Sequence, residues 1–161
     1  MKFPSDLSGI TWTTYIDSDF SNIDKPNAMT LDNAGNIYIG GQGFVSTVQQ
    51  DDYLLAKLDN SGVVQWKKMY SGDAGNTDKI NAIVVDNTTS NVFVTGKSKS
   101  IASGEDYYTI AYDQNGNELW SKRFSTPGLG LDEATDIQLS STNALFVTGY
   151  SYLSSSNNDY Y

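Results

Sequence analysis

Three aspartates recur at one spacing, and their carboxylates are the first side chains in this chain that could do chemistry. Asp24, Asp78 and Asp132 lie 54 residues apart. Carboxylate oxygens are the ligands that calcium prefers, so a ring of these three would bind a cation. The competing interpretation is that each aspartate accepts backbone N–H bonds in a turn. The same residue in every repeat favours the structural role, and calcium is the one cofactor that the sequence leaves open.

The aromatic side chains carry a second candidate chemistry, the binding of sugars. Trp12, Trp66 and Trp120 share the spacing of 54 residues, and each indole offers a flat apolar face with a polar edge. One tryptophan per repeat is also typical of packing between stacked units, which the regularity favours. Tyr107 and Tyr108 could belong to an aromatic binding surface, or could reflect the preference of tyrosine for strands.

Composition excludes several classes of function. The chain has no cysteine and no histidine, which rules out thiolate nucleophiles, Cys/His zinc sites and Ser-His-Asp catalysis. No pair of carboxylates stands out for acid–base work, so the sequence predicts no enzyme. The net charge of −9 disfavours nucleic acid and anionic membrane surfaces. No apolar run approaches the roughly 18 residues of a membrane-spanning helix.

The period of 54 residues indicates an array of like units that stack on one another. In the middle copy, strand-like runs cover 81–86, 91–96, 106–113 and 118–124, with an Asn115-Gly116 turn signal before the last. Four antiparallel strands per unit are the blade of a β-propeller. The whole chain, 1–161, is therefore expected to form one propeller array. Its units are 27–70, 79–124 and 134–161, the last completed by residues 1–17.

The two ends of the chain match parts of one strand pair. Asp159-Tyr160-Tyr161 repeats the start of the strand at Asp106-Tyr107-Tyr108, and the first residues supply the remainder up to Trp12. The expected fold is thus all-β, a propeller with three four-stranded blades per chain whose ends are cut inside one blade. Three blades are fewer than the usual four to eight. A second chain would complete a six-bladed ring, and this homodimer is favoured over the alternative of a piece of a longer propeller.

Several short motifs occur in a fixed order along the middle of the chain. They are Asp52-Tyr53, Ala56-Lys57-Leu58-Asp59, Gly62, Trp66, Asp78, Asn81-Ala82-Ile83, Asp86 and Phe93-Val94-Thr95-Gly96. Together they resemble the SBBP-type β-propeller repeat of bacterial proteins, although Ser140 replaces the aspartate of the other copies. The resemblance implies an exported or cell-surface protein and offers no catalytic residues to carry over.

Two functions remain after these exclusions. The first is a non-catalytic scaffold or self-assembling module of a bacterial surface or secreted protein. The alternative is a lectin-like propeller that binds carbohydrate in repeated pockets between blades, and a glycan or protein ligand would then be its partner.

Overall fold

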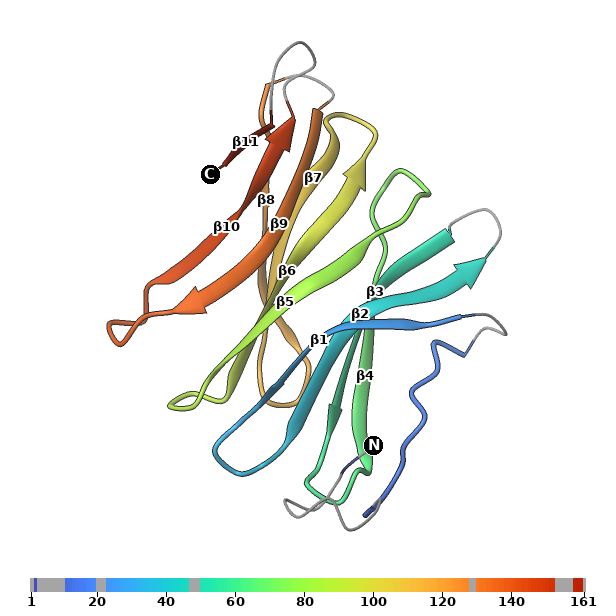
Figure 1. The fold of residues 1–161 in the computed structure, drawn as a ribbon, viewed down its shortest axis with the longest axis vertical. Helices are drawn as coiled ribbons and strands as arrows, with labels where there is room; N and C mark the ends of the chain where they lie inside the picture. The colour runs from blue at the N-terminus through green and yellow to red at the C-terminus, as the bar shows by residue number, and fades with distance from the viewer. Residues whose placement is uncertain are drawn as a thin grey trace.

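Eleven β-strands and no helix make up the described part of the chain (Figure 1). The structure is a computed structural model that describes residues 2, 11–19, 23–46, 50–127, 130–152 and 158–160. The strands are β1 (Lys25–Leu31), β2 (Ile37–Ser46), β3 (Gln50–Leu58), β4 (Val64–Tyr70), β5 (Lys79–Asp86), β6 (Asn91–Ser100), β7 (Gly104–Tyr112), β8 (Glu118–Phe124), β9 (Gly130–Leu139), β10 (Leu145–Tyr152) and β11 (Asn158–Tyr160). The prediction of an all-β protein is confirmed.

The strands fall into three units that follow the repeat. Unit 1 (β1–β4) and unit 2 (β5–β8) are each four antiparallel strands paired in chain order. Unit 3 contains β9, β10 and β11, also antiparallel. Units 2 and 3 are joined by a short parallel pairing of Gly104 with Gly130 and Glu105 with Leu131. The sequence did not predict this junction, because β9 begins before the apolar run at 136–139 that marks it.

Each unit uses a short polar turn that the sequence repeats. Asp113 accepts backbone N–H bonds from Asn115 and Asn117 at 2.8 and 2.9 Å, while Gly116 takes a φ of 77°. An aspartate side chain that holds the backbone two and four residues ahead fixes a tight turn between strands, and glycine supplies the left-handed conformation without strain. The same acceptor role falls to Asp32, Asp59 and, in unit 3, Ser140.

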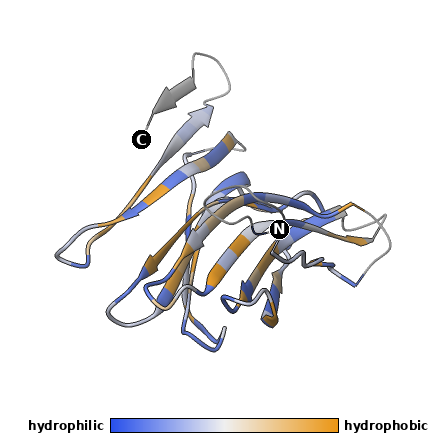
Figure 2. Ribbon diagram, turned by 60° about the horizontal axis from the view of Figure 1, so that its bottom comes forward, coloured by the Kyte–Doolittle hydropathy of each residue, from blue (hydrophilic) through white to orange (hydrophobic). Residues whose placement is uncertain are grey.

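The main core lies between units rather than within one sheet. Its buried residues include Tyr38, Tyr53 and Leu55 from unit 1 and Ile80 and Val94 from unit 2. Hydrophobic stretches along the strands are visible in Figure 2. Unit 2 lies between unit 1 and unit 3 (Figure 1), with contacts from β5 to both β1 and β9. Burying apolar faces against the neighbouring unit is what holds a repeat array together.

A short segment before the first unit also packs on this array. Residues 11–17 lie against unit 1, where Trp12 and Ile16 contact a small core of Ile37, Ala56 and Leu58. Trp12 pairs with Lys2 in an isolated antiparallel bridge. Among the described residues, no helix has the length and apolar character needed to cross a membrane.

Candidate functional site

A polar cleft of about 410 Å³ opens where unit 1 meets unit 2. It lies where the β7–β8 turn of unit 2 runs beside β4, the fourth strand of unit 1. The residues that line it are Asn36, Lys57, Asp59, Gln65 and Trp66 from unit 1 and Gln114 and Asn115 from unit 2. We call it the Trp66 cleft. One of the three predicted tryptophans is therefore at a site that two units build together.

The indole of Trp66 is held rigidly in this cleft. Its Nε1 donates a hydrogen bond to the Gln114 carbonyl at 3.0 Å, and its ring lies 6.1 Å from that of Tyr38. A Cβ added at Gly116 would lie 3.0 Å from the indole Cδ2, so the turn of unit 2 approaches the ring closely. Lys57 Nζ donates to the same carbonyl at 3.2 Å. The aromatic group is thus fixed before any ligand arrives.

Side-chain amides around Trp66 have donor and acceptor atoms that could still form hydrogen bonds. Gln65 donates from Nε2 to Asp59 Oδ2 at 3.0 Å, and Asn36 donates from Nδ2 to Asp32. Their carbonyl oxygens, and the whole side-chain amide of Asn115, form no hydrogen bond with another described residue. Amides both donate and accept, so this rim can bind hydroxyl groups.

Asp59 is the acidic member of the cleft and belongs to its scaffold. Oδ1 accepts hydrogen bonds from the Ser61 hydroxyl at 2.6 Å and from the Val63 N–H at 3.0 Å. These bonds lower the pKa of Asp59, the one from Ser61 most. The carboxylate is therefore ionised at neutral pH, and it orients Gln65 through its other oxygen.

The other two tryptophans have different surroundings. Trp12 lies over the turn at Gly62, beside a smaller apolar cleft of about 170 Å³ whose lining includes Met29 and Leu31. Its Nε1 is buried and has no hydrogen-bond partner among the described residues. Trp120 contacts Phe93 at 5.9 Å and is 38% exposed. The cleft beside Trp12 is mostly apolar, unlike the polar cleft at Trp66.

Of the two predicted tyrosines, Tyr107 is buried and Tyr108 is half-buried. Tyr107 is 5% exposed and contacts Phe124. Tyr108 stacks on Tyr70 with centroids 4.5 Å apart, and its carbonyl accepts a hydrogen bond from the buried Tyr53 hydroxyl. Tyr108 packs against the core between units 1 and 2. Tyr107 faces unit 3 instead, where its hydroxyl lies close to Gly149.

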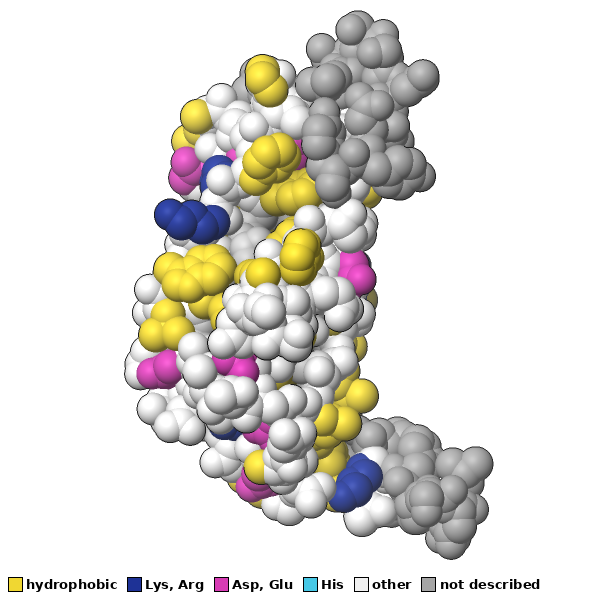
Figure 3. Space-filling model, turned by 90° about the vertical axis from the view of Figure 1, so that its left-hand side faces the viewer, with side chains coloured by type: hydrophobic (Ala, Val, Ile, Leu, Met, Phe, Trp, Pro, Cys, Tyr) yellow, Lys and Arg dark blue, Asp and Glu magenta, His cyan; other side chains and the backbone are white. Residues whose placement is uncertain are grey.

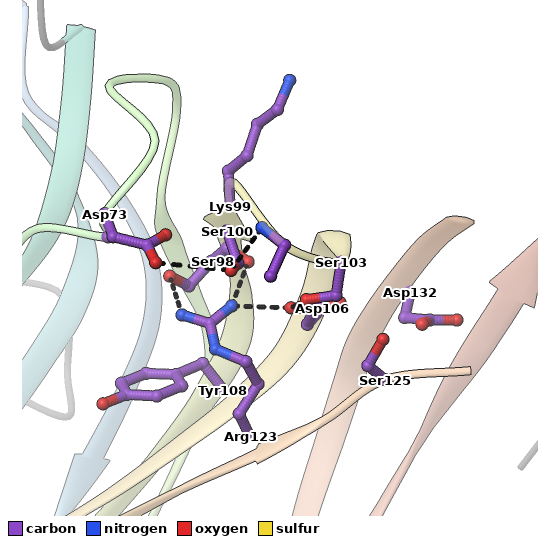
Figure 4. A network of polar contacts seen from close by, with 12 residues as sticks. Asp73, Ser98, Lys99, Ser100, Ser103, Asp106, Tyr108, Arg123, Ser125 and Asp132 are labelled. Carbon is purple, nitrogen blue, oxygen red and sulfur yellow. Dashed lines mark hydrogen bonds and ion pairs between the residues drawn. The ribbon is translucent and has the colours of Figure 1, made fainter. Parts of the chain in front are cut away.

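A buried ion pair that the sequence analysis did not single out lies beside these tyrosines. Figure 4 shows Arg123 between Ser98 and Asp106, with the guanidinium 4.8 Å from the Tyr108 ring centroid. Its Nη1 donates to Asp106 Oδ2 at 2.8 Å, and Asp106 has no exposed surface. Burial lowers the pKa of Arg123, but the bond and charge of Asp106 raise it overall. Arg123 is the single arginine of the chain, and this was the one feature of the sequence that could have drawn attention to it.

The three repeated aspartates form the same kind of backbone hydrogen bond. Each accepts the backbone N–H of the residue six positions before it, at 2.6–2.8 Å; these residues are Ser18, Gly72 and Thr126. Asp24 and Asp78 also accept the N–H of Phe44 and Lys99. Within the described residues, no three acidic side chains gather into a group that could hold a metal ion. This geometry agrees with the turn interpretation of their spacing and gives calcium no common point to bind.

No family model and no curated protein matches the chain. Among solved structures, it is similar to a fucose lectin from Kordia zhangzhouensis determined in complex with methyl-fucoside. The TM-score is 0.47 and the sequence identity 13%, over 83% of this chain and 89% of that lectin. Similarity at this level does not carry a ligand from one protein to the other.

Proposed function

We propose that this chain is a non-catalytic carbohydrate-binding module of the β-propeller type, and that it binds glycans in the Trp66 cleft. The observation that carries the proposal is the composition of that cleft. It combines a fixed aromatic ring with amide oxygens of unit 1 and the Asn115 amide of unit 2, which form no hydrogen bond with another described residue.

The chemistry of the cleft suits a sugar. A sugar ring presents apolar C–H groups on its faces and hydroxyl groups around its edge. An indole offers an apolar surface for the first, and the amides of Gln65 and Asn115 can donate to and accept from the second. Ligand pockets are typically about 300–1,000 Å³, so the cleft of about 410 Å³ suits a small glycan.

The arrangement of the units supports the propeller part of the proposal. Units 1 and 2 are four-stranded, antiparallel and paired in chain order, and they pack face to face around a shared core. Those are the properties of neighbouring propeller blades. The turn of each unit lies beside the fourth strand of the preceding unit, and this places the cleft between blades.

A second candidate function is a scaffold without a small-molecule ligand. It is favoured by the packing of Trp12 on the Gly62 turn and of Trp66 on the Gly116 turn, which is the same contact in units 1 and 2. The two functions differ in what the Trp66 cleft does. A scaffold needs Trp66 but does not need the polar side chains of Gln65 and Asn115 beside it.

Glycan binding can be tested on an array of immobilised glycans, followed by calorimetry with the best hit. We expect Gln65→Ala and Asn115→Ala each to weaken binding about tenfold or more, because each removes about 1–2 kcal/mol of hydrogen bonding to the ligand. Gln138→Ala is the matched control, an exposed amide on β9 that should leave the affinity unchanged. A correctly folded protein that binds no glycan on the array would contradict the proposal and favour the scaffold.

A further inference from the structure

The same aromatic pair occurs in units 1 and 2, whereas unit 3 has only one of its two residues. Tyr38 of β2 contacts Trp66 of β4 at 6.1 Å, and Phe93 of β6 contacts Trp120 of β8 at 5.9 Å. In each case the two residues flank the third strand of the unit. Phe146 of β10 is the equivalent residue of unit 3, since the sequence Phe-Val-Thr-Gly begins at both Phe93 and Phe146. Phe146 is 62% exposed, and no described tryptophan contacts it.

The missing tryptophan of this pattern is present at the other end of the array. Trp12 pairs with Lys2 in the register that joins Trp66 to Lys57 and Trp120 to Ala111. A Cβ at Gly62 would lie 2.6 Å from the Trp12 ring, as one at Gly116 would lie 3.0 Å from that of Trp66.

The lysines repeat this relationship. Lys2 Nζ donates to Asn60 in the turn of unit 1 at 3.0 Å, and Lys57 Nζ donates to Gln114 in the turn of unit 2 at 3.2 Å. Residues 11–17 therefore lie on unit 1 as β4 lies on unit 2. They are placed as a fourth strand, and no aromatic partner equivalent to Tyr38 contacts Trp12 among the described residues.

The inner strand of unit 1 has an open apolar face. Met29 and Leu31 of β1 are 66% and 55% exposed. Their equivalents in β5 are Ile83 and Val85, which unit 1 covers: Val85 is 7% exposed, and Ile83 lies against Gly40. The face of unit 1 that carries Met29 is thus built to receive a unit of the same kind.

We propose that a second copy of this chain binds across these two ends. Trp12 of one copy packs on Phe146 of the other, and unit 3 of that other copy covers Met29 and Leu31 of the first. The occupant is identified by the tryptophan and its strand register, because Phe146 requires a tryptophan from a fourth strand and residues 11–17 carry one in that position. Figure 3 looks onto the side of the molecule where β10 runs and shows hydrophobic side chains gathered on it.

Two copies joined at both ends would form a closed ring of six units. Propellers of four to eight blades are usual, and a head-to-tail contact makes a ring when its rotation closes. Each copy would use its Phe146 end once and its Met29 end once. This inference is independent of glycan binding, since the Trp66 cleft is complete within one chain.

The mass of the full chain in solution, measured by light scattering on a sizing column over a range of concentrations, tests the proposal. We expect twice the mass of one chain. Phe146→Glu and Met29→Glu should each reduce it to the mass of one chain while leaving the circular dichroism spectrum unchanged, since both side chains are exposed within a single copy. Ile101→Glu is the control, an apolar side chain 75% exposed in the β6–β7 turn, and it should keep the double mass.

Mixing the two variants separates this head-to-tail contact from any symmetric one. A mixture of Phe146→Glu and Met29→Glu chains retains one unaltered contact, between the intact Phe146 end and the intact Met29 end, so the double mass should return. A wild-type chain that stays at single mass at every concentration would overturn the proposal. So would a mass that keeps growing with concentration, or a Phe146→Glu variant that still pairs.

Discussion

The Trp66 indole of unit 1 donates its Nε1 hydrogen to the backbone carbonyl of Gln114 in unit 2, at 3.0 Å. This bond ties the fourth strand of one unit to the turn of the next, and the ring fills the space that Gly116 leaves open. The residue is therefore both a contact between units and the aromatic wall of the cleft.

Substitutions at Trp66 should separate these two contributions to stability. Trp66→Phe keeps most of the apolar contact and loses the hydrogen bond, which should lower the free energy of unfolding by about 1 kcal/mol. Trp66→Ala also loses the packing against Tyr38, and the cost should rise to about 3 kcal/mol. Urea unfolding followed by circular dichroism measures both, and an alanine variant as stable as the wild type would show that the ring does not hold the units together.

Arg123 should be needed for stability because its charge compensates that of the fully buried Asp106 carboxylate. Arg123→Ala leaves Asp106 charged and unpaired, which should cost about 3–5 kcal/mol. Adding Asp106→Asn to that variant removes the charge and should restore much of the loss. If the double variant unfolds as easily as Arg123→Ala, the ion pair is not the reason for the loss.

Asp52 occupies the position in unit 1 that Asp106 occupies in unit 2, but without an arginine. The residue equivalent to Arg123 is Met69, and Asp52 Oδ1 has no hydrogen-bond partner among the described residues. Burial, and after it the charge of Asp78, raises the pKa of Asp52 to about 6 from the ordinary 3.8.

The raised pKa of Asp52 gives stability a defined pH dependence. The folded protein binds this proton more tightly than the unfolded chain, so the contribution of Asp52 to the free energy of unfolding falls between about pH 4 and pH 6 and is level above that. Asp52→Asn should raise stability above pH 6 by about 1–2 kcal/mol, with no gain below pH 4. Glu118→Gln is an exposed control, and equal pH profiles for wild type and Asp52→Asn would contradict the assignment.

Calcium should have no effect on stability through the repeated aspartates. Asp24, Asp78 and Asp132 already accept backbone hydrogen bonds. Removing calcium with EDTA leaves those bonds unchanged. We expect the same thermal midpoint in millimolar calcium and in excess EDTA. A midpoint several degrees higher in calcium would place the ion in the folded protein.

The all-β fold was predictable because the local signals of strand and turn agree with one another along the chain. The Asn115-Gly116 turn falls between β7 and β8 as expected, and Asp113 fixes it through its own backbone. The parallel pairing of Gly104 with Gly130 was not predictable, because neither residue has a side chain or a pattern that marks a strand.

The candidate site was predictable only in part. The spacing of Trp66 identified a contact between units, yet the amides around it come from turns, where Asn and Gln are ordinary residues. Asn115 and Gln65 line one cleft only because units 1 and 2 lie side by side in the fold. The role of Arg123 escaped prediction for a related reason, since its partner Asp106 lies 17 residues away on the paired strand.

The glycan site is tested most directly by nuclear magnetic resonance with ¹⁵N-labelled protein, titrated with the best ligand from the array. We predict that the indole Nε1 signal of Trp66 and the side-chain amide signals of Gln65 and Asn115 shift together with one dissociation constant, while the amide of Gln138 stays in place. Ligand-dependent shifts that leave Trp66, Gln65 and Asn115 unchanged would show that the glycan binds elsewhere. The absence of any shift would contradict carbohydrate binding by this chain.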